Sequence, residues 1–317
     1  MGEEKNGATG GAALTRAVFD QLLGQLRPKL HRYCARMTGS VIDGEDVVQE
    51  CLVKAIEAFP AAGTIANPES WLFRIAHNAA LDFLRRRARQ QARSAEEDLA
   101  MIIDPQDSVA DRQVAAMSLR TFMRLPVAQR SSVILMDVLG YSLDEIAGVT
   151  DFTIPAVKAA LHRGRARLSE LAQEPDDRPL PVLSEAERGR LTAYIDRFNA
   201  RDFDAVRNML ADDVRLDLVN RRSLSGRKEV EAYFTNYDRA THWHLAPGFV
   251  EGRPAVLVRN PADLAARPTY FVLLDWAERG LIYIRDFLYA PYVTDEAELV
   301  MLDQTPLADP RLKPRPL

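Results

Sequence analysis

Apolar residues in the first forty positions of the chain recur at intervals of three and four. This period predicts helix, because side chains with that spacing share one helical face. Pro28 lies inside the stripe, where it starts or kinks a second helix. Gly39 follows the last apolar position, as a helix C-cap would. The apolar positions are Phe19, Leu22, Leu23, Leu26, Leu30, Tyr33, Cys34 and Met37.

Two further helices are predicted before residue 90. Asp43 is suited to cap the first of these helices. The apolar face of this helix covers residues 47–59, and Pro60 ends it. Asn67 as a cap and Pro68 at the first helical position predict the second. Its period leaves a polar, mostly basic set outside the core: Arg74, His77, Asn78, Asp82, Arg85 and Arg86.

A second helical group is predicted between two polar segments. Residues 90–111 are weakly patterned, and residues 174–181 contain three prolines, so both segments are expected to be linkers. Within the group, Ser142 and Glu145 have the spacing of a capping box, and Thr153 is suited to cap the following helix. Two short helices joined by a tight turn predict a helix-turn-helix.

The second helix of this motif exposes a basic face that suits the DNA major groove. A merely solvated basic helix in an ordinary bundle is the alternative interpretation. The residues predicted to contact DNA here are Thr153, Lys158, His162, Arg163 and Arg165.

The pattern changes after residue 184. Two helices come first, and four alternating segments then predict strands at residues 214–219, 255–258, 270–276 and 281–288. Helices followed by strands indicate an α+β domain with a curved sheet. The predicted architecture is multidomain, with two all-α modules before the α+β domain. Its parts are a disordered N-terminus 1–14, a helical domain 15–92, a linker 93–111, a helix-turn-helix domain 112–172, a linker 173–183, an α+β domain 184–292 and a tail 293–317.

Charge is segregated along the chain, although the net charge is only −4 and the pI is about 5.8. From Arg74 to Arg93 there are six Arg and one acid, whereas from Asp43 to Glu57 there are five acids and one Lys. Such a chain is expected to contact DNA locally while a partner supplies most of the affinity.

The remaining composition predicts a cytoplasmic protein. No apolar run reaches the length of a membrane helix, and the N-terminus lacks the basic and apolar regions of a signal peptide. Cys34 and Cys51 lie on apolar helical faces and are expected to be buried free thiols.

Three blocks of sequence resemble the extracytoplasmic-function group of RNA polymerase sigma factors, in the family's order. Residues 43–50 resemble sigma region 2.2, residues 71–87 resemble regions 2.3 and 2.4, and residues 125–135 with the helix-turn-helix resemble region 4. The resemblance covers roughly residues 15 to 172. It implies two partners, core RNA polymerase and promoter DNA.

The resemblance also implies roles for particular residues. An acidic face would dock on the β′ clamp helices of the polymerase, and region 4 would dock on the β flap. The third helix would read the −10 promoter element during strand opening. The helix-turn-helix would read the −35 element. The docking residues are Asp43, Asp46, Gln49 and Glu50. The −10 residues are Asn67, Trp71, Arg74, His77, Asn78, Arg85 and Arg86. The period places Trp71 in the core, and capping explains Asn67 equally well.

The C-terminal region resembles SnoaL-like domains over residues 190–217 and 225–234. The resemblance implies a cone-shaped α+β barrel around a pocket, for which Asp217, Trp276 and Asp286 are candidates. His242 and His244 would share one face of a strand, but no third metal ligand is evident. We therefore expect no metal, no cofactor and no catalytic set. The expected role is regulation through intramolecular contact with the sigma domains.

Two other functions are consistent with parts of the sequence. One is a ligand-sensing helix-turn-helix regulator that acts without polymerase, in which the acidic 43–50 segment has no role. The other is a cyclase or isomerase that uses Asp217 or Asp286.

Overall fold

The computed structural model describes residues 15–94, 118–174, 181–238 and 243–302. It divides the chain into two compact units, residues 1–177 and 178–317. The boundary between them falls inside the linker predicted at 173–183. The predicted N-terminal segment and almost all of the linker predicted at 93–111 lie outside the described residues.

The first unit begins with three helices, α1 (Arg16–Thr38), α2 (Val41–Ala58) and α3 (Pro68–Ser94). Gly39 ends α1 with a φ of 77°, as predicted. The N-cap of α2 is Ser40 and not Asp43: the Asp43 N–H donates to the Ser40 hydroxyl at 3.2 Å. Asn67 caps α3 as predicted, accepting from the Ser70 N–H at 3.0 Å.

The second helical group comprises α5 (Leu119–Met123), α6 (Val127–Val133), the π-helical turn η2 (Ile134–Val138), α7 (Leu143–Thr150) and α8 (Ile154–Gln173). The capping box of Ser142 and Glu145 is complete, and the Thr153 side chain caps α8. Asp151 makes the turn between α7 and α8 in the left-handed conformation, at a φ of 59°. The predicted helix-turn-helix is confirmed.

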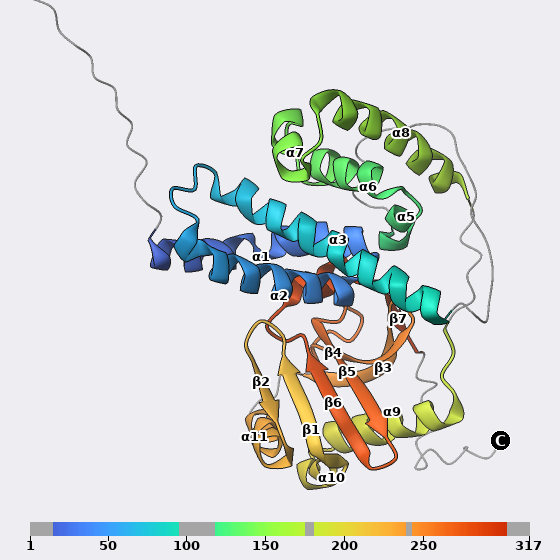
Figure 1. The fold of residues 1–317 in the computed structure, drawn as a ribbon. Coiled ribbons are helices and arrows are strands. Elements are labelled where there is room, and N and C mark those ends of the chain that lie inside the picture. Colours follow the sequence, from blue (N-terminus) through green and yellow to red (C-terminus); the bar gives the residue numbers. More distant parts are fainter. Residues whose placement is uncertain (1–14, 95–117, 175–180, 239–242, 303–317) are drawn as a thin grey trace, which may run out of the picture. The chain divides into compact units, whose positions relative to one another are not determined.

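Both predicted helical groups are present, but they share one hydrophobic core instead of forming separate modules. Figure 1 shows the α5–α8 group lying along α1 and α3. The buried guanidinium of Arg130 on α6 donates to the Met37 carbonyl of α1 at 2.6 Å. The sequence could not show this because the two residues are 93 positions apart. Cys34 and Cys51 are buried free thiols in this core, as predicted.

Over its described residues, the second unit combines four helices with a seven-stranded mixed sheet in the order β2-β1-β6-β5-β4-β3-β7. Among the described strands, only β1 and β6 pair in parallel. The helices are α9 (Glu185–Asn199), α10 (Phe203–Asn208), α11 (Arg227–Asp238) and α12 (Pro291–Glu296). The strands are β1 (Leu210–Leu218), β2 (Arg222–Ser225), β3 (His244–Val250), β4 (Arg253–Arg259), β5 (Tyr270–Ala277), β6 (Gly280–Asp286) and β7 (Leu299–Met301).

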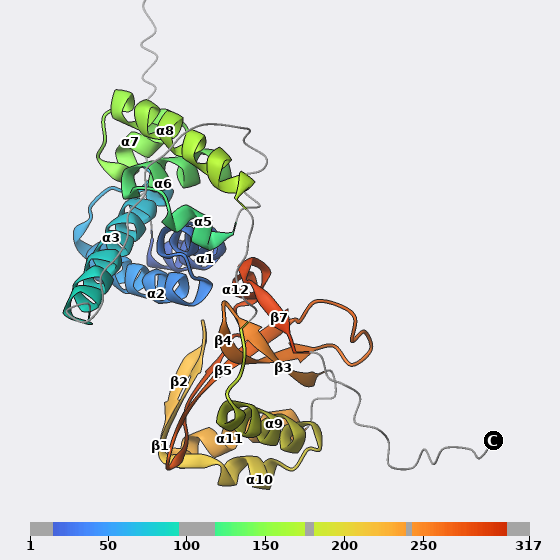
Figure 2. The same cartoon turned by 90° about the vertical axis from the view of Figure 1, so that its right-hand side faces the viewer.

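The sheet curves around helices on one face, which is the predicted α+β architecture (Figure 2). Helices α9 and α11 pack on the sheet, and the second hydrophobic core fills the space between them. All four predicted strands are present, while β2, β3 and β7 were not predicted. Helix α12 extends into the predicted tail and β7 lies wholly within it. The domain therefore continues to Met301, because β7 completes the sheet edge beside β3.

Close packing of α1 on α2 depends on Gly44. A Cβ atom at this position would lie 2.6 Å from the Ala35 backbone. We expect Gly44→Ala to lower the free energy of unfolding by about 1–3 kcal/mol, because the helices must separate. A Cβ atom at exposed Gly24 in α1 would meet no atom within 4 Å, so Gly24→Ala is the control, expected to raise stability by about 0.5–1 kcal/mol. Urea unfolding measures both, and equal effects would contradict the packing argument.

Candidate nucleic-acid interface

Helix α8 presents a basic face from the helix-turn-helix. Lys158, His162 and Arg163 are exposed, while the predicted inward residues Val157 and Leu161 are buried. The three exposed side chains form no ion pair with any described residue, so they are available to bases or phosphates.

Arg165, which was predicted to contact DNA, instead holds α8 to η2. Its Nε lies 3.0 Å from Oδ2 of Asp137, whose side chain is only 1% exposed. A buried carboxylate without a partner is costly, so this arginine is committed to Asp137. Thr153 is exposed, and its hydroxyl is used in capping. Lys158, His162 and Arg163 are therefore the residues of the predicted face whose side chains hold no other described element in place.

Helix α3 presents a second basic face. Arg74, Asn78, Arg85 and Arg86 are exposed, as predicted. The three arginines have carboxylate partners, and the N···O distances are 2.8 Å for Arg74–Asp151, 3.0 Å for Arg85–Asp82 and 2.7 Å for Arg86–Glu50. Exposed ion pairs contribute only about 0–1 kcal/mol. Phosphates can therefore replace these carboxylates.

His77 does not belong to this face, and its predicted exposure is wrong. It is 2% exposed, and its Nδ1 lies 2.6 Å from the Tyr33 hydroxyl. Its position, four residues after buried Phe73, turns it into the core. Burial lowers the pKa of His77 to about 4, so the ring is neutral at pH 7.

The acidic face of α2 lies beside the basic face of α3. Asp43 pairs with Arg87 at 3.0 Å and Glu50 with Arg86, so ion pairs join the two predicted surfaces. The hydrogen bond from Arg86 lowers the pKa of Glu50. Of the other two predicted docking residues, Asp46 is exposed and Gln49 is half-buried.

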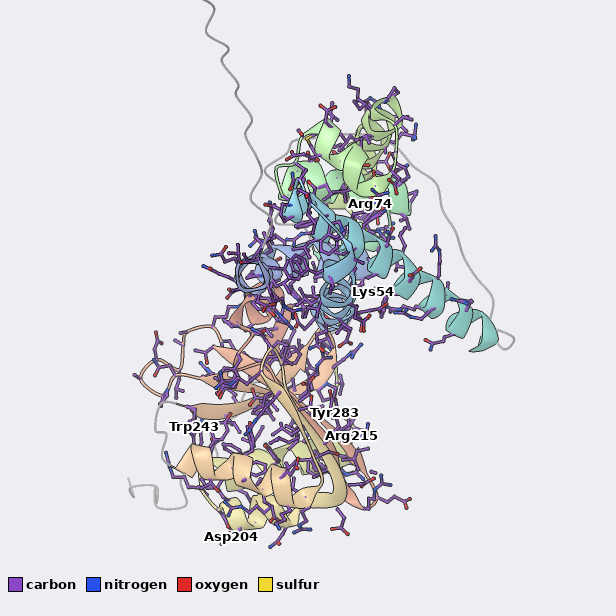
Figure 3. The ribbon with its side chains drawn as sticks, turned by 60° about the vertical axis from the view of Figure 1, so that its left-hand side comes forward. Lys54, Arg74, Asp204, Arg215, Trp243 and Tyr283 are labelled. Atoms are coloured by element: carbon purple, nitrogen blue, oxygen red, sulfur yellow. The ribbon has the colours of Figure 1, made fainter. Side chains whose placement is uncertain are left out.

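A cavity of about 510 Å³ lies where the loop before α3 meets α7. The loop and α3 contribute Ala62, residues 64–67, Ser70, Trp71 and Arg74, and α7 contributes Asp144, Glu145 and Gly148. Trp71 is half-buried, with its ring centroid 6.1 Å from that of Phe19. Figure 3 shows Arg74 at the end of α3 that adjoins α7. The acidic start of α7 thus faces the loop that holds Asn67, one of the residues predicted to contact the −10 element.

Glu69 on α3 links the two helical groups beside this cavity. Its Oε1 accepts from the Tyr141 hydroxyl at 2.6 Å and from Lys29 at 2.5 Å. Burial, followed by the hydrogen bond to Glu69, raises the pKa of Tyr141, which keeps the hydroxyl protonated as a donor. Sequence reasoning missed Glu69, Tyr141 and Arg130, since no local pattern signals a contact between distant segments.

The pocket residues predicted in the second unit are not brought together. Asp286 is buried beneath a cavity, hydrogen-bonded to Tyr233 and Tyr237, which line it. Asp217 instead interacts with Arg285 at 3.6 Å, and neither Asp217 nor Trp276 lines this cavity. His244 begins β3, while its predicted companion His242 lies outside the described residues.

Comparison with known proteins identifies the first unit. Residues 22–90 match the model of Sigma-70 region 2, and residues 119–168 match that of Sigma-70, region 4. The two helical groups of the first unit therefore correspond to Sigma-70 regions 2 and 4. The chain is 34% identical to the ECF RNA polymerase sigma factor SigM of Mycobacterium tuberculosis over 156 residues, which are 49% of this chain and 78% of that protein. The chain belongs to the ECF RNA polymerase sigma factors.

Similar solved structures include the sigma factor RpoE in complex with the anti-sigma factor NepR from Bartonella quintana. The match covers 50% of this chain and 98% of the RpoE chain, with 28% identity and a TM-score of 0.40. The Mycobacterium tuberculosis extracytoplasmic function sigma factor SigJ covers 84% of this chain and 95% of its own, with 20% identity and a TM-score of 0.33. Within the described residues, no helix is both long and apolar enough to span a membrane.

The buried His77 predicts an acid-dependent loss of stability. Its folded pKa of about 4 lies below the unfolded value of about 6.5. The stability it contributes is complete above pH 6.5 and is lost as pH falls toward 4, because the unfolded chain binds the proton first. Between pH 7 and 4.5 this amounts to about 2.5 kcal/mol.

Urea unfolding at the two pH values tests this expectation. His77→Gln should reduce the difference in unfolding free energy between pH 7 and 4.5, whereas the same substitution at exposed His162 should leave that difference unchanged. An unchanged difference in His77→Gln would show that the ring is not the group responsible.

Proposed function

We propose that this sigma factor reads promoters through two separate basic faces. Helix α8 enters the major groove of the −35 element, while α3 and the preceding loop act on the −10 element. The observation that carries the proposal is the exposed face of Lys158, His162 and Arg163 on a helix-turn-helix whose other face is buried.

In this proposal core polymerase supplies most of the binding energy. The chain carries a net charge of −4, so it attracts DNA weakly as a whole. The acidic face of α2, where Asp46 is exposed, complements a basic coiled-coil surface such as the β′ clamp helices, and region 4 lies on the β flap. The site of action is the cytoplasm.

The role is that of a specificity subunit and not of an enzyme. A regulator acting without polymerase gives no role to the acidic α2 face, and family membership does not favour it. The second unit acts in this proposal as a regulatory domain that controls access to the sigma surfaces. Its separate core, without residues of the first unit, supports an independently folded module.

In the first unit the two helical groups pack on one shared core, and we call this arrangement the closed form. Asp144 and Glu145 of α7 line the cavity at the −10 loop, and their carboxylates oppose an approaching phosphate backbone. Glu69 and Tyr141 hold the helical groups together at this point. We infer that α7 leaves the loop before the −10 element is read, and that binding to core polymerase drives this opening.

The α8 face is tested by transcription in vitro with core polymerase. Lys158→Ala and Arg163→Ala should each reduce promoter-dependent transcripts about 5- to 150-fold, the equivalent of about 1–3 kcal/mol for a base-specific contact. Binding to core polymerase should be unchanged. Arg188→Ala, an exposed cation on α9, is the matched control. An equal loss of core binding would show that α8 contacts polymerase and not DNA.

The closed form is tested with the free chain and a single-stranded −10 oligonucleotide. Tyr141→Phe removes the hydrogen bond to Glu69, and Asp151→Asn removes the ion pair with Arg74 while tolerating the left-handed turn. The double variant should bind about tenfold more tightly by fluorescence anisotropy, since a hydrogen bond to a charged group contributes about 1.5–3 kcal/mol.

Tyr289→Phe is the control for this experiment, because Tyr289 is 41% exposed and lies in the second unit. Unchanged affinity in the double variant, with the fold retained by circular dichroism, would contradict the idea that α7 blocks the loop.

A further inference from the structure

The thioether of Met123 lies where the two helical groups of the first unit meet. Met123 is the last residue of α5, and its Sδ accepts a hydrogen bond from Nη1 of Arg130 at 3.0 Å. The same nitrogen donates to the Met37 carbonyl of α1. The sulfur therefore takes part in the contact that fixes the α5–α8 group on α1.

Gly39, at the end of α1, bounds the Met123 side chain on another side. A Cβ atom at Gly39 would overlap Cγ of Met123 and would lie 3.0 Å from its Sδ. The side chain thus packs directly on the backbone of α1, and this packing is possible because glycine has no side chain. A larger group at the sulfur has to displace α5 or leave this contact.

The sulfur of Met123 is also accessible to a small reagent. Met123 is half-buried, whereas Met37 is fully buried. Cys34 and Cys51 are fully buried as well, and burial raises the pKa of both thiols, which keeps them protonated and unreactive. Oxidation of a thioether needs no deprotonation, so Met123 can react with a two-electron oxidant at neutral pH.

We propose that Met123 is an oxidative modification site, and that its sulfoxide opens the closed form. Hydrogen peroxide transfers one oxygen atom to the sulfur: the O–O bond breaks, an S–O bond forms, the sulfur gives up two electrons, and water leaves. The effect on DNA binding rests on the proposed function. The loosening of α5 does not depend on it.

The present contact has no room for the added oxygen. A hydrogen bond from Arg130 to that oxygen requires about 2.9 Å between nitrogen and oxygen. The sulfur that would carry the oxygen already lies 3.0 Å from Nη1 of Arg130, so the sulfur must retreat and take α5 with it. The alternative is that the oxygen turns to solvent and the side chain leaves Gly39. Either response weakens the contact between α5 and α1, because a polar sulfoxide replaces an apolar thioether.

Mass spectrometry of the full chain treated with hydrogen peroxide tests the site. Met123 should be converted to the sulfoxide while buried Met37 stays reduced and the circular dichroism of the chain is unchanged. Met301, which is 36% exposed, reports that the reagent has acted. A reduced Met123 in a sample whose Met301 is fully oxidised would overturn the proposal.

Hydrogen exchange measures the loosening without DNA. After oxidation, the backbone amides of residues 119–133 should exchange about tenfold faster, because their contact with α1 is weaker. The same treatment should leave Met123→Leu unchanged, since leucine keeps the apolar volume and cannot be oxidised. Met301→Leu, on β7, is the matched control and should respond as the unsubstituted chain does. An equal response in Met123→Leu would assign the effect to another residue and overturn the proposal.

The single-stranded −10 oligonucleotide connects this site to the closed form. Met123→Gln places a polar oxygen close to where the sulfoxide would carry one. Without oxidant this variant should bind the oligonucleotide about tenfold more tightly than the unsubstituted chain, and so should the oxidised chain.

The outcomes separate the two proposals. If Tyr141→Phe with Asp151→Asn raises the affinity while Met123→Gln and oxidation do not, the proposal for Met123 fails alone. If oxidation loosens α5 but none of these changes raises the affinity, the modification site is supported and the closed form does not block DNA.

Discussion

The first unit depends on one buried arginine. Arg130 donates to the carbonyl of Met37, at the C-terminal end of α1, and to the carbonyls of Met123 and Leu125, which precede α6. Burial lowers its pKa to about 10, so it still carries its charge at neutral pH. Carbonyls at a helix C-terminus lack intrahelical partners and carry partial negative charge, which makes them suitable acceptors for a buried guanidinium. Removing it would leave buried carbonyls without donors.

This contact joins region 2 to region 4 and explains how the surfaces are arranged. Once α6 is fixed on α1, helix α7 lies against α3, and Tyr141 reaches Glu69. The predicted docking acid Glu50 then pairs with the predicted DNA-contact residue Arg86, while Asp43 pairs with Arg87 and Arg74 pairs with Asp151. The arginine of each pair is exposed and each pair is individually weak, so a polyanion or a polymerase surface can exchange with them. In the proposed mechanism the closed form covers the surfaces proposed to contact promoter DNA. Opening it costs little free energy, because these ion pairs are weak.

The second unit follows a different physical rule. Its core contains many aromatic rings, and polar groups gather at one buried carboxyl, Asp286. A buried carboxyl is tolerated when its oxygens have donors, and here tyrosine hydroxyls and a backbone N–H provide them. The ten residues that line the cavity above it carry no formal charge, in contrast to the basic faces of α3 and α8. The charged surfaces of the described chain thus lie on the first unit's helices α3 and α8, whereas the described lining of this cavity is uncharged.

Local structure was readable from the order of the residues. The caps of Asn67, Ser142 and Thr153, the outward face of α8 and four of the strands were all predictable, because each depends on residues within a few positions of one another. The family's motifs likewise identified the chain from contiguous blocks. The folded structure was needed to show that His77 is buried, that Arg165 serves Asp137, and that the two helical groups share a core. It was also needed to show which polar residues of the second unit meet, since Asp286 and Tyr233 are 53 positions apart. Local periodicity specifies which face of an element is apolar, but only packing decides what that face contacts.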